Sequence, residues 1–418
     1  MLSHVPTLHD RFLLRRKALM KRRLLLRMAA ACAASMLVSE VAHASAPAAT
    51  MDGVASAYQM NAEHNGFSRN GVAAPPLKRK WLRDLGAAVS YPVIANGKVF
   101  VTVAARDGYG TVLRALDVRT GKDVWKPLKL QHSSRWSALT LGAGRLYVLT
   151  GSATLTAHDI HTGKLLWTRK LPNQSSSTAA PTYRGGMVYV TAVGTGATMY
   201  AVHAATGTVT WRQKILGGNQ SSPAVTTEGI YVSYSCQYTY RLALRTGATT
   251  WKYAPSCYGG GGRTAVVAAG SLWVRDAQRQ YPATALSLTD GTPRGTFSMN
   301  HDDMRAPTFL GRTGFFVANG MLQARSTQIP NKSLWTFLDN RRITSAPIVV
   351  NGYVYAGSED GHIYAINPAT GRTVWSAPLG APVQPPDEHN LSEPLTGLAA
   401  GQGILAVPAT NLLVAYGK

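Results

Sequence analysis

The stretch TSAPIVVNGYVYAGSEDGHIYAINPATGRTVW, residues 344–375, decides the fold. It consists of short apolar or alternating runs separated by turn signals. The Asn351-Gly352 pair favours a type I′ hairpin, because both central positions of that turn need a positive φ. Two further Gly-containing turns follow, so the stretch predicts four short antiparallel strands, which together make one blade of a β-propeller. The four expected strands are 344–350, 353–357, 362–366 and 372–375.

The end of this stretch recurs along the chain with a period near 40 residues. In five copies a Thr-Gly pair precedes a tryptophan, with the glycine four residues before it. Two more divergent copies end at Phe297 and Trp335. Such a period, with four strand-like runs per copy, is typical of propellers, whose blades must stack to bury their faces. We expect the glycines to adopt positive φ and the tryptophans to supply apolar bulk between blades. These repeat residues are Trp125, Trp167, Trp211, Trp251, Trp335 and Trp375, with Gly121, Gly163, Gly207, Gly247 and Gly371.

The two ends of the repeat region complement each other. Residues 79–85, which contain Trp81, resemble a fourth strand that has no predecessors. After Trp375 the runs 395–399, 403–408 and 412–416 lack a fourth strand. Joining the two parts gives an all-β, eight-bladed propeller without open ring edges, which would invite aggregation. Seven blades is the alternative.

Residues 1–44 have the composition of a cleaved export signal. Basic groups at 15–17 and 21–23 precede an apolar stretch from Met28 to Val38, and Ala42-His43-Ala44 fits a cleavage site. Tat and Sec export both remain open. We therefore expect a periplasmic or secreted protein, with an N-terminal extension at 45–76 and the propeller at 77–418. No other segment is long and apolar enough to span a bilayer.

The chain is strongly basic, with a formal net charge of +23. Such a surface attracts polyanions such as acidic glycans or anionic lipid, although a generally basic exported protein is the alternative. The charges are spread along the chain, so no specific nucleic-acid tract is expected. Cys32 leaves with the signal, and Cys236 and Cys257 fall in loops expected on one face. We expect these two to form a disulfide, as an even pair in an exported protein suggests.

Motifs for nucleophilic catalysis, nucleotide binding, zinc proteases and haem attachment are missing from the sequence. Two acidic clusters remain, at 300–303 and 387–390. Their carboxylates could bind a metal or act as acid and base, or could be hydrated turn residues.

Several arginines precede the expected inner strands, where loops enter the central channel. Guanidinium groups gathered there would bind a carboxylate or phosphate, or would pair with the acidic clusters across the ring. Both alternatives stay open. The candidate binding residues at this channel mouth are Arg135, Trp136, Arg263, Arg305, Arg342, Asp302, Asp303, Asp387 and Glu388.

The repeat resembles that of the pyrroloquinoline-quinone (PQQ) propeller family. Residues 115–125 match its Ala-x-Asp-x-x-Thr-Gly-x-x-x-Trp core throughout, 157–167 match it too, and 58–66 look like the start of bacterial members. The resemblance covers about residues 55–418. It implies one of two functional branches: quinoprotein alcohol dehydrogenases, which bind PQQ and calcium, or outer-membrane assembly propellers, which are eight-bladed scaffolds without PQQ.

The chain looks closer to the scaffold branch. It lacks the adjacent cysteines that many quinoprotein dehydrogenases carry, and it has little length beyond its blades. We therefore expect a monomeric scaffold without cofactor or catalytic residues, which binds an envelope protein or an acidic glycan. A PQQ- and calcium-dependent dehydrogenase is the alternative.

Overall fold

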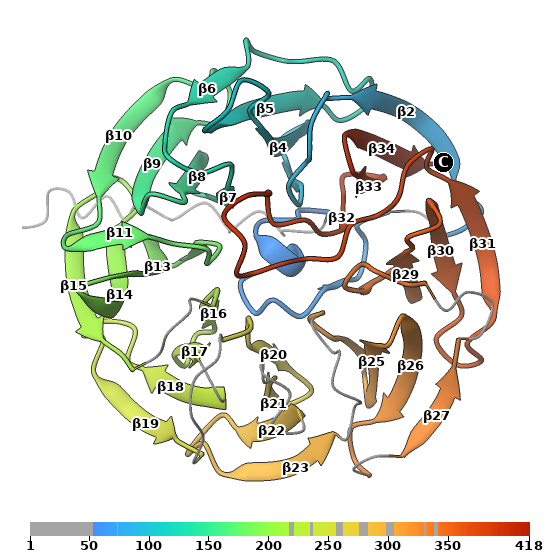
Figure 1. Cartoon of the computed structure of the whole chain (residues 1–418). Coiled ribbons are helices and arrows are strands. Elements are labelled where there is room, and N and C mark those ends of the chain that lie inside the picture. The colour runs from blue at the N-terminus through green and yellow to red at the C-terminus, as the bar shows by residue number, and fades with distance from the viewer. Residues whose placement is uncertain are drawn as a thin grey trace, which may run out of the picture. The chain divides into compact units, whose positions relative to one another are not determined.

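The computed structural model describes residues 53–72, 74–216, 221–234, 237–255, 262–275, 283–297, 305–329, 332–337 and 342–418. The described residues form eight sheets arranged as a ring, all antiparallel except for one short parallel pair in one sheet (Figure 1). Each sheet is a blade, and its strands follow one another from the centre of the ring to the rim. The export segment proposed at 1–44, both remaining cysteines, Asp302 and Asp303 lie outside the described residues.

The strands of the eight blades are as follows. Blade 1 holds β3 (Val93–Ala95), β4 (Lys98–Ala104), β5 (Thr111–Asp117) and β6 (Leu128–Leu130), and blade 2 holds β7 (Ser137–Gly142), β8 (Arg145–Thr150), β9 (Thr154–Asp159) and β10 (Leu165–Lys170). Blade 3 holds β11 (Gln174–Ser176), β12 (Thr182–Arg184), β13 (Met187–Gly194), β14 (Gly196–His203) and β15 (Val209–Lys214). Blade 4 holds β16 (Ala224–Val225), β17 (Ile230–Tyr234), β18 (Tyr238–Leu242) and β19 (Thr249–Tyr253). Blade 5 holds β20 (Val266–Ala268), β21 (Ser271–Val274), β22 (Ala283–Ser287) and β23 (Pro293–Phe297). Blade 6 holds β24 (Thr308–Leu310), β25 (Thr313–Ala318), β26 (Met321–Ser326) and β27 (Ser333–Thr336). Blade 7 holds β28 (Ile348–Val350), β29 (Tyr353–Gly357), β30 (His362–Ile366) and β31 (Thr373–Pro378), with β1 (Phe67–Ser68) added to β28. Blade 8 holds β32 (Ala399–Gly401), β33 (Ile404–Ala409), β34 (Leu412–Gly417) and β2 (Lys78–Asp84).

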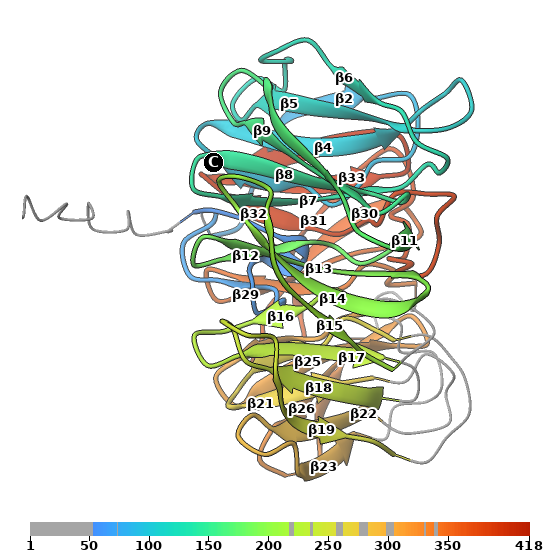
Figure 2. The same ribbon diagram turned by 90° about the vertical axis from the view of Figure 1, so that its left-hand side faces the viewer.

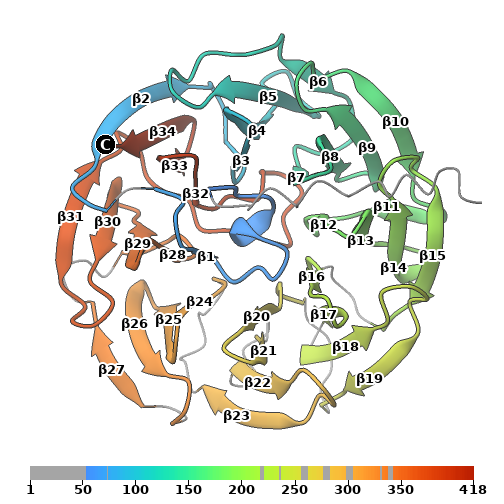
Figure 3. The same ribbon diagram turned by 180° about the vertical axis from the view of Figure 1, so that it is seen from behind.

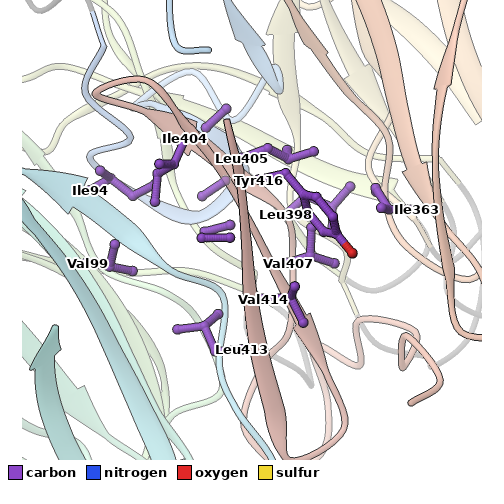
Figure 4. Close-up of a cluster of buried hydrophobic side chains, with 14 of the residues drawn as sticks. Ile94, Val99, Ile363, Leu398, Ile404, Leu405, Val407, Leu413, Val414 and Tyr416 are labelled. Carbon is purple, nitrogen blue, oxygen red and sulfur yellow. The ribbon is translucent and has the colours of Figure 1, made fainter. Parts of the chain in front are cut away.

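Blade 8 closes the ring as the sequence predicts. Strand β2 pairs antiparallel with the C-terminal strand β34, and Trp81 lies opposite Ala415. The eight-bladed architecture is therefore confirmed, and the seven-bladed alternative is wrong. The seam is well packed, because the apolar cluster around β33 and β34 also includes Ile94 and Val99 of blade 1 and Ile363 of blade 7 (Figure 4).

The repeat residues perform linked packing roles. A small alanine lies opposite the tryptophan on the neighbouring strand, as in Ala157–Trp167, Ala201–Trp211 and Ala365–Trp375. In five copies (Trp81, Trp167, Trp211, Trp251 and Trp335) the indole Nε1 donates a hydrogen bond to a carbonyl of the next blade, as Trp167 does to Ala204 O at 3.0 Å. The ring also lies against the turn glycine of that blade, so that Gly207 packs on Trp167. The motif therefore ties neighbouring blades together.

The strand limits differ from the sequence-based ones at the rim. In blade 7 the last strand starts at Thr373 and continues to Pro378, so Trp375 lies inside the strand rather than at its end. In blade 1, Trp125 precedes β6, which begins only at Leu128. Pro127 lies between them, and its missing N–H cannot join the ladder with β5.

The ring has two unlike faces. The connections between the first and second strands and between the third and fourth strands meet on one face, here called the turn face. Hydrogen bonds join the two connections, such as Val118 N to Gly97 O and Thr327 N to Arg312 O. The remaining connections, including the long β31–β32 loop at 379–398, form the opposite face, here called the loop face (Figure 2).

Residues 53–72, here called the hub segment, fill the centre of the ring from the turn face (Figure 3). The segment includes the short η1 turn (Tyr58–Met60), whose three side chains are buried. It contacts the inner strand of every blade, or a residue beside that strand. The partners are Ile94, Leu141, Arg184, Val225, Val267, Thr308, Val349 and, in blade 8, Ala400 and Gly403. Most of the predicted N-terminal extension is thus an internal part of the propeller, and it belongs to the same compact unit as the blades.

Candidate functional site

The centre of the ring is here called the hub. A buried carboxylate lies there, on the loop-face side. Glu388 belongs to the β31–β32 loop, which crosses the hub in front of η1 in Figure 1. Its side chain is 1% exposed, and Oε2 accepts hydrogen bonds from Thr264 N and Thr264 Oγ1, both at 2.6 Å. Two donors on one oxygen hold the carboxylate in place and offset part of the cost of burying its charge.

Two arginines from blade 5 lie near this carboxylate. Arg275 is 2% exposed, donates from Nη2 to Thr264 O at 2.8 Å and lies 3.9 Å from Glu388 Oε1. Arg263 is 3% exposed; burial lowers the pKa of its guanidinium, and the charge of Glu388 opposes that shift. Arg263 and Glu388 are among the residues predicted from the sequence, whereas Arg275, which directly follows β21, belongs to no recognisable motif.

The hub segment supplies the other side of this polar centre. Tyr58 is fully buried, and burial raises the pKa of its phenol well above the usual value. His64 is also fully buried, and its ring nitrogens face Tyr58 O at 2.7 Å and Pro223 O at 2.9 Å. His389 donates from Nε2 to Gly262 O at 2.5 Å, and burial lowers the pKa of its imidazole. The His389 contact joins the long loop to the start of blade 5, and the His64 contact with Pro223 O joins the hub segment to the start of blade 4.

The described residues of the hub do not fit a calcium-bound quinone. No group of three His, Cys, Asp or Glu side chains that could hold a metal is found among the described residues. Calcium takes six to eight oxygen ligands, whereas the buried hub offers one carboxylate, and one of its oxygens already accepts two hydrogen bonds. The side chains of Tyr58 and His64 in the same region are fully buried.

An open pocket of 720 Å³ lies beside the hub on the loop face, at the seam between blade 8 and blades 1 and 2. It combines the cations Arg106 and Arg135 with the carboxylates Asp387 and Glu393. Arg135 Nη1 lies 3.6 Å from Glu393 Oε1, both on the pocket wall. The apolar part of the lining comes from Ala87, Ala88, Val89, Pro385 and Pro394.

The other predicted channel residues are separated by the structure. Trp136 is fully buried in the hydrophobic cluster of blades 1 to 3. Arg305 donates from Nε to Thr344 O at 3.1 Å, and Arg342 Nε lies 3.4 Å from Glu359 Oε2 near blade 7. Of the nine predicted residues, the hub brings together Arg263 and Glu388, while Arg135 and Asp387 line the pocket.

Comparisons with known proteins agree with this architecture. The model of a family described as outer membrane protein assembly factor BamB matches residues 108–254 and 237–396. No curated protein matches the chain significantly. The solved structure of BamB from Moraxella catarrhalis has a TM-score of 0.60 at 18% identity, covering 82% of this chain and 100% of that chain.

Quinoproteins share the same fold. A quinohemoprotein alcohol dehydrogenase from Comamonas testosteroni has a TM-score of 0.69 at 15% identity, covering 93% of this chain and 84% of that chain. A europium-containing methanol dehydrogenase has a TM-score of 0.61 at 13% identity, covering 88% of this chain and 98% of that chain. At such identities these likenesses show the fold alone.

Proposed function

We propose that this chain, which belongs to the family described as outer membrane protein assembly factor BamB, is an exported, non-catalytic propeller of the cell envelope that binds a protein partner on its loop face. The observation that carries the proposal is the 720 Å³ pocket at the closure seam. Loops mounted on a rigid frame are a common place for binding sites.

The chemistry of the pocket favours a polypeptide over an acidic glycan. Arg106 and Arg135 share its lining with Asp387 and Glu393, and alanines and prolines separate them. A peptide segment can offer both signs of charge together with apolar side chains. An acidic glycan would gain from the two arginines but would meet two carboxylates of its own sign.

The pocket is held in shape before a partner arrives. Its longest wall, the loop 379–398, is tied to the frame by Tyr91 N to Leu395 O at 2.8 Å and by Arg135 N to Leu391 O at 3.0 Å. The buried hydrogen bonds between Glu388 and Thr264 anchor the same loop at the hub. A preformed surface pays less ordering entropy on binding.

A pocket-filling substitution tests the proposal. Ala88 is partly exposed on the pocket wall, so Ala88→Arg would place a bulky cation inside it. We expect the mature wild-type protein to retain an envelope protein from a membrane extract and Ala88→Arg to lose it. Thr168→Arg, on the exposed face of β10, is the matched control and should retain the partner. Equal retention by wild type and Ala88→Arg would reject the pocket as the binding site, and retention of an acidic glycan alone would reject a protein partner.

We further propose that this function needs neither PQQ nor calcium. The packed hub, which has one buried carboxylate among its described residues, supports this view. A ligand selective for the native state raises the melting temperature. We expect no shift when PQQ and calcium are added together, and a saturable upward shift would instead favour the quinoprotein dehydrogenase.

A further inference from the structure

The turn face gathers cations that are scattered in the sequence. Each blade contributes the turn between its third and fourth strands, and several of these turns carry an exposed basic residue beside the repeat glycine. Arg119 and Lys122 flank Gly121, Lys164 follows Gly163, and Arg372 follows Gly371. Other exposed basic side chains on the same turns or on turns beside them are Arg69, His161, Arg245, Arg294, Arg312 and Lys332.

The described acidic groups on this face are fewer than the exposed basic ones, and they are Glu63, Asp117, Asp123, Asp159, Glu228 and Asp290. Asp159 Oδ1 accepts hydrogen bonds from His161 N, Thr162 N and Thr162 Oγ1 within its own turn. Asp117 Oδ1 accepts the equivalent set from Arg119 N and Thr120. Glu63 pairs with Arg184 at 2.7 Å. The described part of the turn face therefore carries a clear excess of positive charge.

The loop face differs from the turn face in its charge and in the length of its connections. Its described cations, such as Arg106 and Arg342, are accompanied by Asp107, Glu359 and Asp387. Its connections include the long loop 379–398, whereas the turn face is built from short reverse turns such as Asn96-Gly97 and Asn351-Gly352. Viewed from the side, the turn ends of the sheets lie together along one edge of the ring (Figure 2).

We propose that the turn face docks on a membrane surface rich in acidic phospholipid headgroups. A broad basic face made of short turns complements a planar anionic surface, and each Lys or Arg near such a surface strengthens binding by about fivefold. A linear polyanion would bind better to a groove or to a single continuous run of basic residues than to such a broad face. Docking in this way leaves the loop face directed away from the bilayer and does not depend on the proposed protein partner.

Vesicle binding separates this proposal from a general effect of net charge. The mature chain would be sedimented with vesicles of phosphatidylcholine alone and with vesicles containing phosphatidylglycerol. The test variant replaces Arg119, Lys122, Lys164 and Arg372 by Gln. The control variant removes the same charge from the outer strands and their flanks, at Lys129, Lys170, Lys214 and Lys252.

We expect the wild type to bind only the acidic vesicles, with an affinity that falls as salt rises. The affinity of the turn-face variant for acidic vesicles should be lower than that of the wild type by about 100-fold or more. The affinity of the control variant should stay within about fivefold of the wild-type value. Melting temperatures equal to that of the wild type would show that both variants are folded. Equal losses in the two variants, or no preference for acidic vesicles, would overturn the proposal. Binding to soluble heparin without binding to vesicles would overturn it in favour of a polymer.

Discussion

The indole of Trp81 lies so close to Gly121 that a Cβ atom on this glycine would stand 2.7 Å from ring atom Cδ2. Trp81 Nε1 also donates to Val118 O at 3.0 Å, three residues before the glycine. Trp81 comes from the N-terminal strand of blade 8 and Gly121 from blade 1. This contact therefore fastens the closing strand to the next blade around the ring.

Replacing Gly121 by alanine should destabilise the protein for two reasons. Its φ of +67° is costly for a residue with a side chain, and the added methyl group would collide with the Trp81 ring. Gly144 is a matched control, because its φ is +69° and a Cβ there would meet nothing within 4 Å. We expect Gly144→Ala to cost about 1–2 kcal/mol from the backbone alone.

Gly121→Ala should cost about 1–3 kcal/mol more than Gly144→Ala, because overpacking adds to the backbone strain. Urea unfolding monitored by tryptophan fluorescence measures both variants. Equal losses would mean that the Trp81 contact adds nothing to stability.

The buried carboxylate of the hub should matter for stability far more than one at the pocket rim. Glu388→Gln would keep the shape of the side chain but would leave the nearby Arg275 without its opposing charge. Removing one partner of a buried charged group is expected to cost about 3 kcal/mol. The exposed Glu393, which lies near Arg135, is the control, and Glu393→Gln should change stability by less than about 0.5 kcal/mol. Similar values in chemical denaturation would contradict the structural role assigned to Glu388.

Stability should fall in acid partly because of His132. Burial lowers the pKa of this imidazole from 6.5 to about 4, near Thr111 Oγ1 and Ser137 Oγ. Between these two values the unfolded chain binds a proton that the native protein does not, so the free energy of unfolding decreases as pH falls. Well above pH 6.5 both states are neutral at this group, and it contributes no pH dependence.

His132→Asn should therefore flatten the pH dependence between pH 6.5 and pH 4. The quantity to compare is the change in unfolding free energy between these two pH values, in the wild type and in the variant. Other titrating groups act in both proteins and cancel in that comparison. An unchanged pH dependence would show that His132 titrates normally in the folded state.

Much of the fold can be predicted because its cause is local and repeated. The Asn351-Gly352 turn and the apolar runs around it specify hairpins, and the Thr-Gly…Trp spacing sets the blade. The closure of the ring can be predicted by counting strands. The strand that contains Trp81 lacks the other three strands of a blade, and the last blade lacks its fourth strand. The sequence does not show that tryptophans such as Trp167 and Trp211 contact the turn glycine of the following blade, because that contact depends on how two blades stack.

The centre of the ring is harder to predict for a physical reason. Residues 53–72 contact successive blades largely through backbone atoms, such as Ala62 O with Val225 N and Gly66 O with Val349 N. Backbone contacts leave no residue pattern. Arg275 is likewise a single arginine after a strand, and only the ring brings it near Glu388. The basic turn face depends on topology in the same way, because its cations are far apart in the chain.

Position-specific photo-crosslinking in the cell envelope tests the central claim most directly. A photoreactive phenylalanine analogue would be placed at Ala88 or Gln384 in the loop-face pocket, and at Thr168 or Thr210 on exposed outer strands. We expect both pocket positions to capture the same envelope protein and both outer positions to capture none of it. Capture of that protein from the outer strands with none from the pocket, or no protein adduct at any position, would show that the loop-face pocket is not a binding site for an envelope protein.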